Sequence, residues 1–92
     1  MFTQRATVRN KHGIHCRPSA IIAKECSQYT GTIMVSADGH PDVDAKSVLL
    51  LMGLGLKHED TVTVKVSGPD EAATCKTVVI LIETCFDFER NA

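Results

Sequence analysis

The sequence has no excess of positive charge, since 10 Lys and Arg residues face 11 Asp and Glu residues and the formal net charge is −1. Nucleic-acid-binding domains carry a basic surface that neutralises phosphates, so nucleic acid is not an expected partner. Long hydrophobic runs are also missing. The longest apolar stretches, 47–56 and 78–82, are far shorter than the roughly 20 residues of a membrane-spanning helix. The N-terminus has neither the basic nor the apolar region of a signal peptide. We therefore expect a cytoplasmic protein without membrane insertion, folded as one domain over residues 1–92.

The sequence also lacks the residue sets of common enzyme, cofactor and metal sites. It has no paired carboxylates, no nucleophile triad and no cofactor-binding loop, so we expect neither an enzyme nor a cofactor. Its four cysteines include no C-x-x-C pair, and Cys26, Cys75 and Cys85 fall on apolar helix faces. These three are expected to be free thiols that act as small buried side chains in a reducing compartment.

The hydrophobic pattern predicts strands and helices in the order β-α-β-β-α-β-α. The predicted strands span residues 2–9, 32–36, 43–45 and 61–67, and the predicted helices span about 16–29, 48–52 and the stretch from 69 onward. An antiparallel sheet covered by helices on one side would bury the single hydrophobic face of such a chain, which predicts an α+β fold.

The same periodicity predicts which side chains are buried. The first strand is expected to bury every second residue, namely Phe2, Gln4, Ala6 and Val8. The last helix is expected to start near Ser67, with Pro69 in its first turn and two acidic residues, Asp70 and Glu71, at its positive end. Its core positions recur at spacings of three and four, at Ala72, Cys75, Val79, Ile82 and Phe86.

A glycine loop leads directly into a helix over residues 10–20, Asn-Lys-His-Gly-Ile-His-Cys-Arg-Pro-Ser-Ala. A helix begins with backbone N–H groups that lack an intrahelical partner, so its start is suited to an anion. Pro18 fits the first turn because it has no N–H, which leaves the amides of Cys16 and Arg17 as free donors. Arg17 adds a permanent cation whose fork geometry suits phosphate. His15, at the helix start, is therefore the candidate carrier of a phosphoryl group.

Two segments together resemble the signatures of the histidine-containing phosphocarrier proteins (HPr) of the bacterial phosphoenolpyruvate-dependent phosphotransferase system. Residues 13–20, Gly-Ile-His-Cys-Arg-Pro-Ser-Ala, look like the family's active-site signature. Residues 46–55, Lys-Ser-Val-Leu-Leu-Leu-Met-Gly-Leu-Gly, look like its serine-bearing signature at the expected separation. The resemblance covers nearly the whole chain. It implies an open-faced β-sandwich with a four-stranded antiparallel sheet and three helices on one face, which agrees with the order of elements above.

By this resemblance, His15 accepts a phosphoryl group from phospho-enzyme I and passes it to an EIIA-type transporter component or a related acceptor, with Arg17 assisting. The protein is then a stoichiometric carrier, which we expect to be a monomer. The chemistry of the residues agrees with this role. A neutral imidazole is a nucleophile, and the positive end of a helix disfavours the imidazolium. The amides of Cys16 and Arg17 can receive the phosphate oxygens.

Ser47 has two compatible roles at the start of the second predicted helix. As an N-cap, its side-chain oxygen accepts a hydrogen bond from an N–H of the following turn. As the matched family serine, it is implied to be a regulatory phosphosite for HPr kinase/phosphorylase. The resemblance also implies that this helix borders the active histidine, so we expect a docking patch for partners formed by Val48, Leu49, Met52 and Ala20. Burial in the core is the alternative for some of the helix residues, because a short helix needs one buried side.

Three positions depart from the usual family pattern. Cys16 stands where alanine is commonest, Leu50 stands where glycine is frequent, and His12 adds a second imidazole to the active loop. Cys16 is either a reactive thiol at a helix start or a small side chain that points inward. These departures leave open whether the chain belongs to the sugar-uptake branch or to the nitrogen-related regulatory branch.

The alternative function is a small ligand- or metal-binding regulatory module without phosphoryl transfer. It is suggested by the clustering of His12, His15 and Cys16, since zinc and copper accept such ligands. No second His/Cys pair completes a ligand set, because His40 and His58 stand alone on expected surface turns. We therefore expect no metal site.

Overall fold

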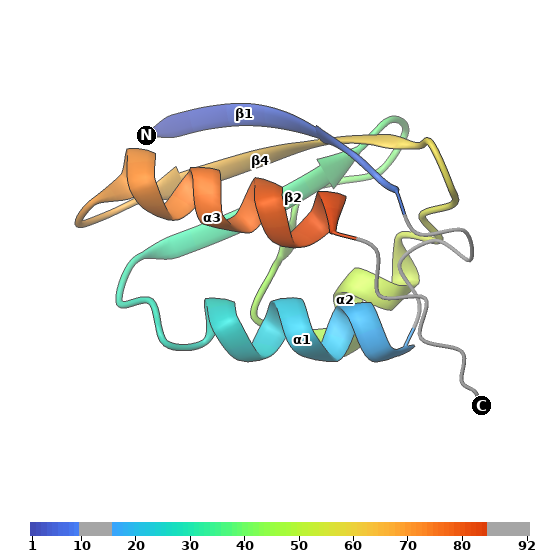
Figure 1. Cartoon of the computed structure of the whole chain (residues 1–92), viewed down its shortest axis with the longest axis horizontal. Coiled ribbons are helices and arrows are strands. Elements are labelled where there is room, and N and C mark those ends of the chain that lie inside the picture. Colours follow the sequence, from blue (N-terminus) through green and yellow to red (C-terminus); the bar gives the residue numbers. More distant parts are fainter. Residues whose placement is uncertain (10–15, 85–92) are drawn as a thin grey trace.

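A four-stranded antiparallel sheet forms one layer of the molecule, and three helices cover one of its faces (Figure 1). The computed structural model describes residues 1–9 and 16–84, with only the backbone described at residues 16 and 17. Along the chain the elements are β1 (Phe2–Thr7), α1 (Cys16–Cys26), β2 (Thr32–Ala37), β3 (Val43–Asp44), α2 (Val48–Gly53), β4 (Thr61–Ser67) and α3 (Glu71–Glu83). The predicted α+β open-faced sandwich, with its order of elements, is therefore confirmed.

The strands are arranged in the order β1-β4-β2-β3, which places β4 in the interior of the sheet. Val62 of β4 lies opposite Ala6 of β1, and Val64 lies opposite Val35 of β2. These side chains are almost completely buried. The alternation of valine and polar residues along 61–67 thus gives one face packed against the helices and one face open to solvent, as the pattern predicts.

The first strand is shorter and less buried than predicted. It ends at Thr7, and only Ala6 and the following Val8 are fully buried, whereas Phe2 is 38% exposed and Gln4 is half-buried. The reason is that β1 is an edge strand, with a neighbour on one side only. Phe2 instead lines a shallow hollow between the edge of the sheet and the outer face of α3.

The first and last helices also differ from their predicted bounds. Helix α1 ends at Cys26, three residues early, and the chain continues in a tighter turn in which the Tyr29 N–H donates to the Cys26 carbonyl oxygen at 3.0 Å. The Tyr29 hydroxyl donates to the carbonyl oxygen of Pro69 at 2.7 Å. Helix α3 begins at Glu71, which leaves Pro69 and Asp70 outside its first turn. Asp70 adopts a left-handed conformation (φ 50°, ψ 40°) that no helical residue shares.

The buried stripe of α3 consists of residues spaced three and four apart, namely Cys75, Val78, Val79 and Ile82. The prediction is therefore right for three positions and wrong for Ala72, which is exposed and lines the hollow beside Phe2. Phe86, also predicted for this stripe, lies outside the described residues. The short third strand ends at Asp44, and Ala45 is buried just after it.

Candidate functional site

Helix α1 starts at Cys16, immediately after His15, where the sequence predicts it. His15 itself lies outside the described residues, as does His12. Pro18 is the third residue of α1 and is fully buried, so it fills a place in the first turn whose N–H would have no intrahelical acceptor. The first turn of α1 is thus held against the core by Pro18, while its leading backbone amides belong to Cys16 and Arg17.

The inward face of α1 is made by Ser19, Ile22, Ala23 and Cys26, and Ala20 faces solvent. The Ser19 hydroxyl is completely buried and, within the described parts of the chain, its Oγ has no hydrogen-bond partner. The sequence offers no signal for this orphan hydroxyl, because serine at that position is equally suited to an exposed first turn.

Cys26 and Cys75 are buried and free, as expected. Burial is the main cause that raises the pKa of the Cys26 thiol to about 12, with a smaller contribution from Asp44. Burial also raises the pKa of Cys75, whose Sγ donates to the carbonyl oxygen of Val64 at 3.7 Å. Both thiols therefore stay protonated near neutral pH and act as core side chains. Cys85 lies outside the described residues.

Ser47 caps helix α2. It has an extended backbone (φ −107°, ψ 116°), and its Oγ accepts a hydrogen bond from the Leu50 N–H at 3.2 Å. The predicted N-cap is therefore confirmed. The Ser47 side chain is half-buried. Helix α2 packs against α1. Figure 1 shows α2 beside the N-terminal half of α1, the half that contains the candidate site at the start of that helix.

The apolar run after Ser47 is divided between core and surface. Leu51 is 1% exposed and belongs to the core, and Val48 is half-buried against the core. Three neighbours face solvent, with Leu49 80% exposed, Leu50 47% and Met52 39%. We call these three residues the α2 apolar surface. Burial in the core is thus confirmed for Leu51, whereas the docking patch stays a prediction whose residues Leu49 and Met52 are exposed.

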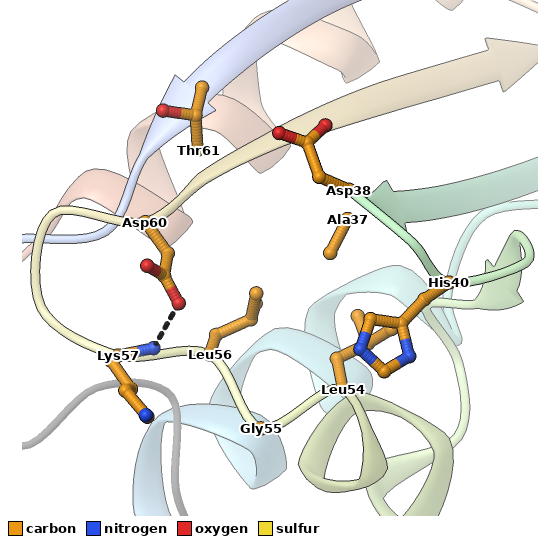
Figure 2. A pocket seen from close by; sticks show the side chains of 9 residues that line it. All are labelled: Ala37, Asp38, His40, Leu54, Gly55, Leu56, Lys57, Asp60 and Thr61. Atoms are coloured by element: carbon orange, nitrogen blue, oxygen red, sulfur yellow. Dashed lines mark hydrogen bonds between the residues drawn. The ribbon is translucent and has the colours of Figure 1, made fainter.

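A shallow hollow of about 280 Å³ lies between the turn after β2 and the connection from α2 to β4 (Figure 2). Its lining includes Ala37, His40, Leu56 and Asp60, and the Asp60 Oδ2 accepts the Lys57 N–H at 2.8 Å. Sequence reasoning misses this hollow because its walls come from two separate segments, 37–40 and 54–61.

The metal-binding alternative gains no support from the part of the chain that the structure describes. Within residues 1–9 and 16–84, no three His, Cys, Asp or Glu side chains are grouped so that they could hold a metal ion. His40 and His58 are exposed, as expected for surface turns. Among the same residues, no helix has the length and hydrophobicity needed to cross a membrane.

Comparison with known proteins gives a consistent result. Residues 2–84 match the family model for the PTS HPr component phosphorylation site. The phosphocarrier protein HPr of Mycoplasma genitalium is 32% identical over 79 residues, which cover 86% of this chain and 90% of that protein. HPr of Cupriavidus necator is 33% identical over 86 residues, which cover 94% of this chain and 96% of that protein. The crystal structure of an HPr from Thermoanaerobacter tengcongensis superposes with a TM-score of 0.81 at 33% identity, covering 89% and 91% of the two chains.

Proposed function

This chain belongs to the HPr family of the phosphotransferase system and is a phosphocarrier, and we propose that it carries the phosphoryl group on His15. The observation that carries this proposal is that His15 immediately precedes Cys16, the first residue of α1. The leading N–H groups of a helix lack intrahelical partners and attract an anion, an effect of about 0.3 to 2 kcal/mol depending on burial. The burial of Pro18 supports a rigid first turn at this place.

The proposed transfer needs a neutral imidazole as nucleophile. A ring nitrogen of His15 forms a bond to the phosphorus of phospho-enzyme I while the bond from that phosphorus to its donor breaks, and the donor keeps the electron pair. In the second transfer the nucleophile of an EIIA-type acceptor takes the phosphoryl group, and His15 keeps the electron pair. The group therefore passes through the protein unchanged, in keeping with a carrier that is not an enzyme.

Cys16 and Arg17 are proposed to hold the phosphoryl group while it resides on His15. Both are in the first turn of α1, so their amides are among the donors without intrahelical acceptors. The Arg17 guanidinium would add a charge-assisted contact to the phosphate oxygens. Its role is therefore to stabilise the phosphorylated form and the transfer, while His15 supplies the nucleophile.

Partner proteins are proposed to dock on the α2 apolar surface, with Ala20 of α1 at its border. The exposure of Leu49 and Met52 supports their part in this surface. Val48 is half-buried against the core, so only part of its side chain is available to a partner. Solvent-exposed aliphatic and methionine side chains suit a surface that binds more than one partner in turn.

Ser47 is proposed as a regulatory phosphosite, modified by an HPr kinase/phosphorylase. Its hydroxyl stands at the start of α2 and accepts the N–H of Leu50, a residue of the α2 apolar surface. Phosphorylation there would add a charge of about −1.5 to −2 at the border of an apolar docking surface. The modification would thus weaken docking by partners that bury this surface, while leaving the nucleophile intact.

The experiment that tests the proposed function is transfer of labelled phosphate from phosphoenolpyruvate through a cognate enzyme I. The wild-type protein should take up one acid-labile phosphate per chain, and His15→Ala should abolish the label. His58→Ala is the control, because it removes another exposed imidazole of the chain and should leave labelling unchanged. Persistent labelling of a folded His15→Ala protein would overturn the proposal.

A further inference from the structure

Helix α2 is too short to fix its own position. It has six residues, fewer than the roughly 12 to 15 at which an isolated helix becomes even marginally stable in water. Only Leu51 among its side chains is fully buried, whereas the three residues of the α2 apolar surface face solvent. The place of this surface relative to α1 therefore depends on the packing of Leu51 in the core and on what anchors the start of the helix.

Lys46, the residue before the N-cap, makes that anchor. Its Nζ donates to the carbonyl oxygens of Tyr29, at 2.8 Å, and Gly31, at 2.9 Å, in the connection between α1 and β2. Its backbone N–H donates to Asp44 Oδ1 at 2.9 Å, and the next N–H, of Ser47, donates to the Asp44 carbonyl at 3.1 Å. The start of α2 is thus tied through the Lys46 side chain to the connection that follows α1, and through the backbone to β3.

The two carbonyls that Lys46 contacts are themselves held in place. The Tyr29 hydroxyl donates to the Pro69 carbonyl at 2.7 Å. Gly31 lies so close to the backbone of Ser67 and Gly68 that no Cβ would fit between them. A hydrogen bond from an ammonium group is roughly twice as strong as one between neutral groups. Lys46 therefore connects α2 to a closely packed part of the fold. Its side chain is half-buried, and its ammonium group already bonds to two carbonyl oxygens of the same chain.

We propose that Lys46 is a positioning residue that sets the place of the α2 apolar surface beside α1, and so the affinity of partner proteins for this carrier. The inference rests on the proposed function, in which partners dock on that surface. Lys46 acts through the chain, not by contact with the partner. Nothing in the sequence indicates this role, because a lysine before a helix reads as a solvated cation.

The kinetic test compares three variants in enzyme I-dependent phosphorylation at increasing carrier concentration. Lys46→Met keeps the chain length and removes both ammonium hydrogen bonds. It should raise the KM of enzyme I for the carrier by about twofold to tenfold with little change in kcat, because a smaller fraction of the protein is competent to dock. Lys46→Arg should restore the KM. Lys65→Met is the matched control, since Lys65 pairs with Asp42 away from α2 and its loss should leave the KM unchanged.

Two further readouts separate positioning from a direct charge contact. Amide hydrogen exchange at Leu50 and Leu51, whose N–H groups bond to Ser47, should become faster in Lys46→Met and not in Lys65→Met. The rise in KM should also persist at high salt, where a direct ion pair with a partner would already be screened. Unchanged exchange and unchanged KM in a folded Lys46→Met protein would overturn the inference, as would a KM effect that vanishes with salt.

The failure of this inference and the failure of the proposed function give different results. If the wild-type protein takes up no phosphate, the proposed function is wrong, and the exchange experiment alone decides whether Lys46 holds α2. If the wild-type protein is phosphorylated on His15 and Lys46→Met matches the wild type in both KM and amide hydrogen exchange, only the positioning role is wrong.

Discussion

The backbone N–H of Leu50 donates to the Oγ of Ser47 at 3.2 Å, so the proposed phosphosite is also the cap of helix α2. The Ser47 hydroxyl thus caps the helix and is also the proposed site of regulation. The two roles are separable by substitution, because aspartate accepts the same backbone hydrogen bond and alanine does not.

Ser47→Ala should lower the free energy of unfolding by about 1 kcal/mol through loss of the cap. Ser47→Asp should stay close to wild type, since its carboxylate replaces the hydroxyl as acceptor and favours the positive helix end. Urea unfolding, monitored by circular dichroism, measures the free energy of unfolding of both variants. An equal loss of stability in the two variants would contradict the capping role.

Leu51 and Leu49 are matched leucines on one short helix, the first in the core and the second 80% exposed. Leu51→Ala should lower the free energy of unfolding by about 2 to 5 kcal/mol, because it leaves a cavity in the core. Leu49→Ala should change stability by less than about 0.5 kcal/mol, as for other surface substitutions. Only Leu49→Ala should weaken phosphoryl transfer without loss of structure. Unchanged KM values for enzyme I and for acceptor domains in this variant would remove Leu49 from the docking surface.

Glu71 provides a pH-dependent contribution to stability. The Met1 amino group, 3.1 Å from Oε2, and the Gly68 N–H hold the pKa of this carboxyl below its ordinary value of 4.5. A carboxylate whose pKa is lowered in the folded state stabilises the fold at pH values above its ordinary pKa. This contribution is lost as the pH falls through the folded-state pKa. The stability difference between wild type and Glu71→Gln should therefore be constant near neutral pH and shrink below pH 4.5. Thermal unfolding across pH 3 to 7 tests this; a difference that grows at low pH has the wrong sign.

Local patterns in the sequence are sufficient for much of the fold. The alternation at Val62, Val64 and Val66 identifies a strand with one buried face, and the serine before an apolar run identifies the cap of α2. These signals work because strand period and helix capping depend on neighbours along the chain.

The features that sequence reasoning misses depend on residues far apart in the chain. The Tyr29 hydroxyl bonds to Pro69, 40 residues away, and Lys46 bonds to the carbonyls of Gly31 and Tyr29, 15 and 17 residues earlier. The exposed Ala72 lines a hollow beside Phe2, the first residue of the edge strand β1 and 70 positions earlier in the chain. None of these contacts leaves a periodic trace in the sequence. Local chemistry predicts the start of α1 and the cap of α2, and both are confirmed, whereas the role of His15 stays a prediction. The Lys46 anchor of α2 has no such local signal.

Gly31 is required by close packing between two connections. A Cβ there would collide with the carbonyl oxygen of Ser67 and with the Tyr29 ring. Gly31→Ala should therefore lower the free energy of unfolding by about 1 to 3 kcal/mol, the range for an overpacked site. Gly53→Ala is the control, because a Cβ at that helical position meets no atom within 4 Å. Equal stability of the two variants in urea unfolding would contradict the packing.

The central claim is tested most directly by locating the phosphorus atom in the phosphorylated protein. After reaction with phosphoenolpyruvate and enzyme I, nitrogen–phosphorus coupling in NMR spectra of ¹⁵N-labelled protein identifies the modified ring. The account predicts one phosphate per chain, bonded to a ring nitrogen of His15, with His12, His40 and His58 unmodified. A phosphate on another histidine or on Cys16, or no phosphate at all, would contradict it.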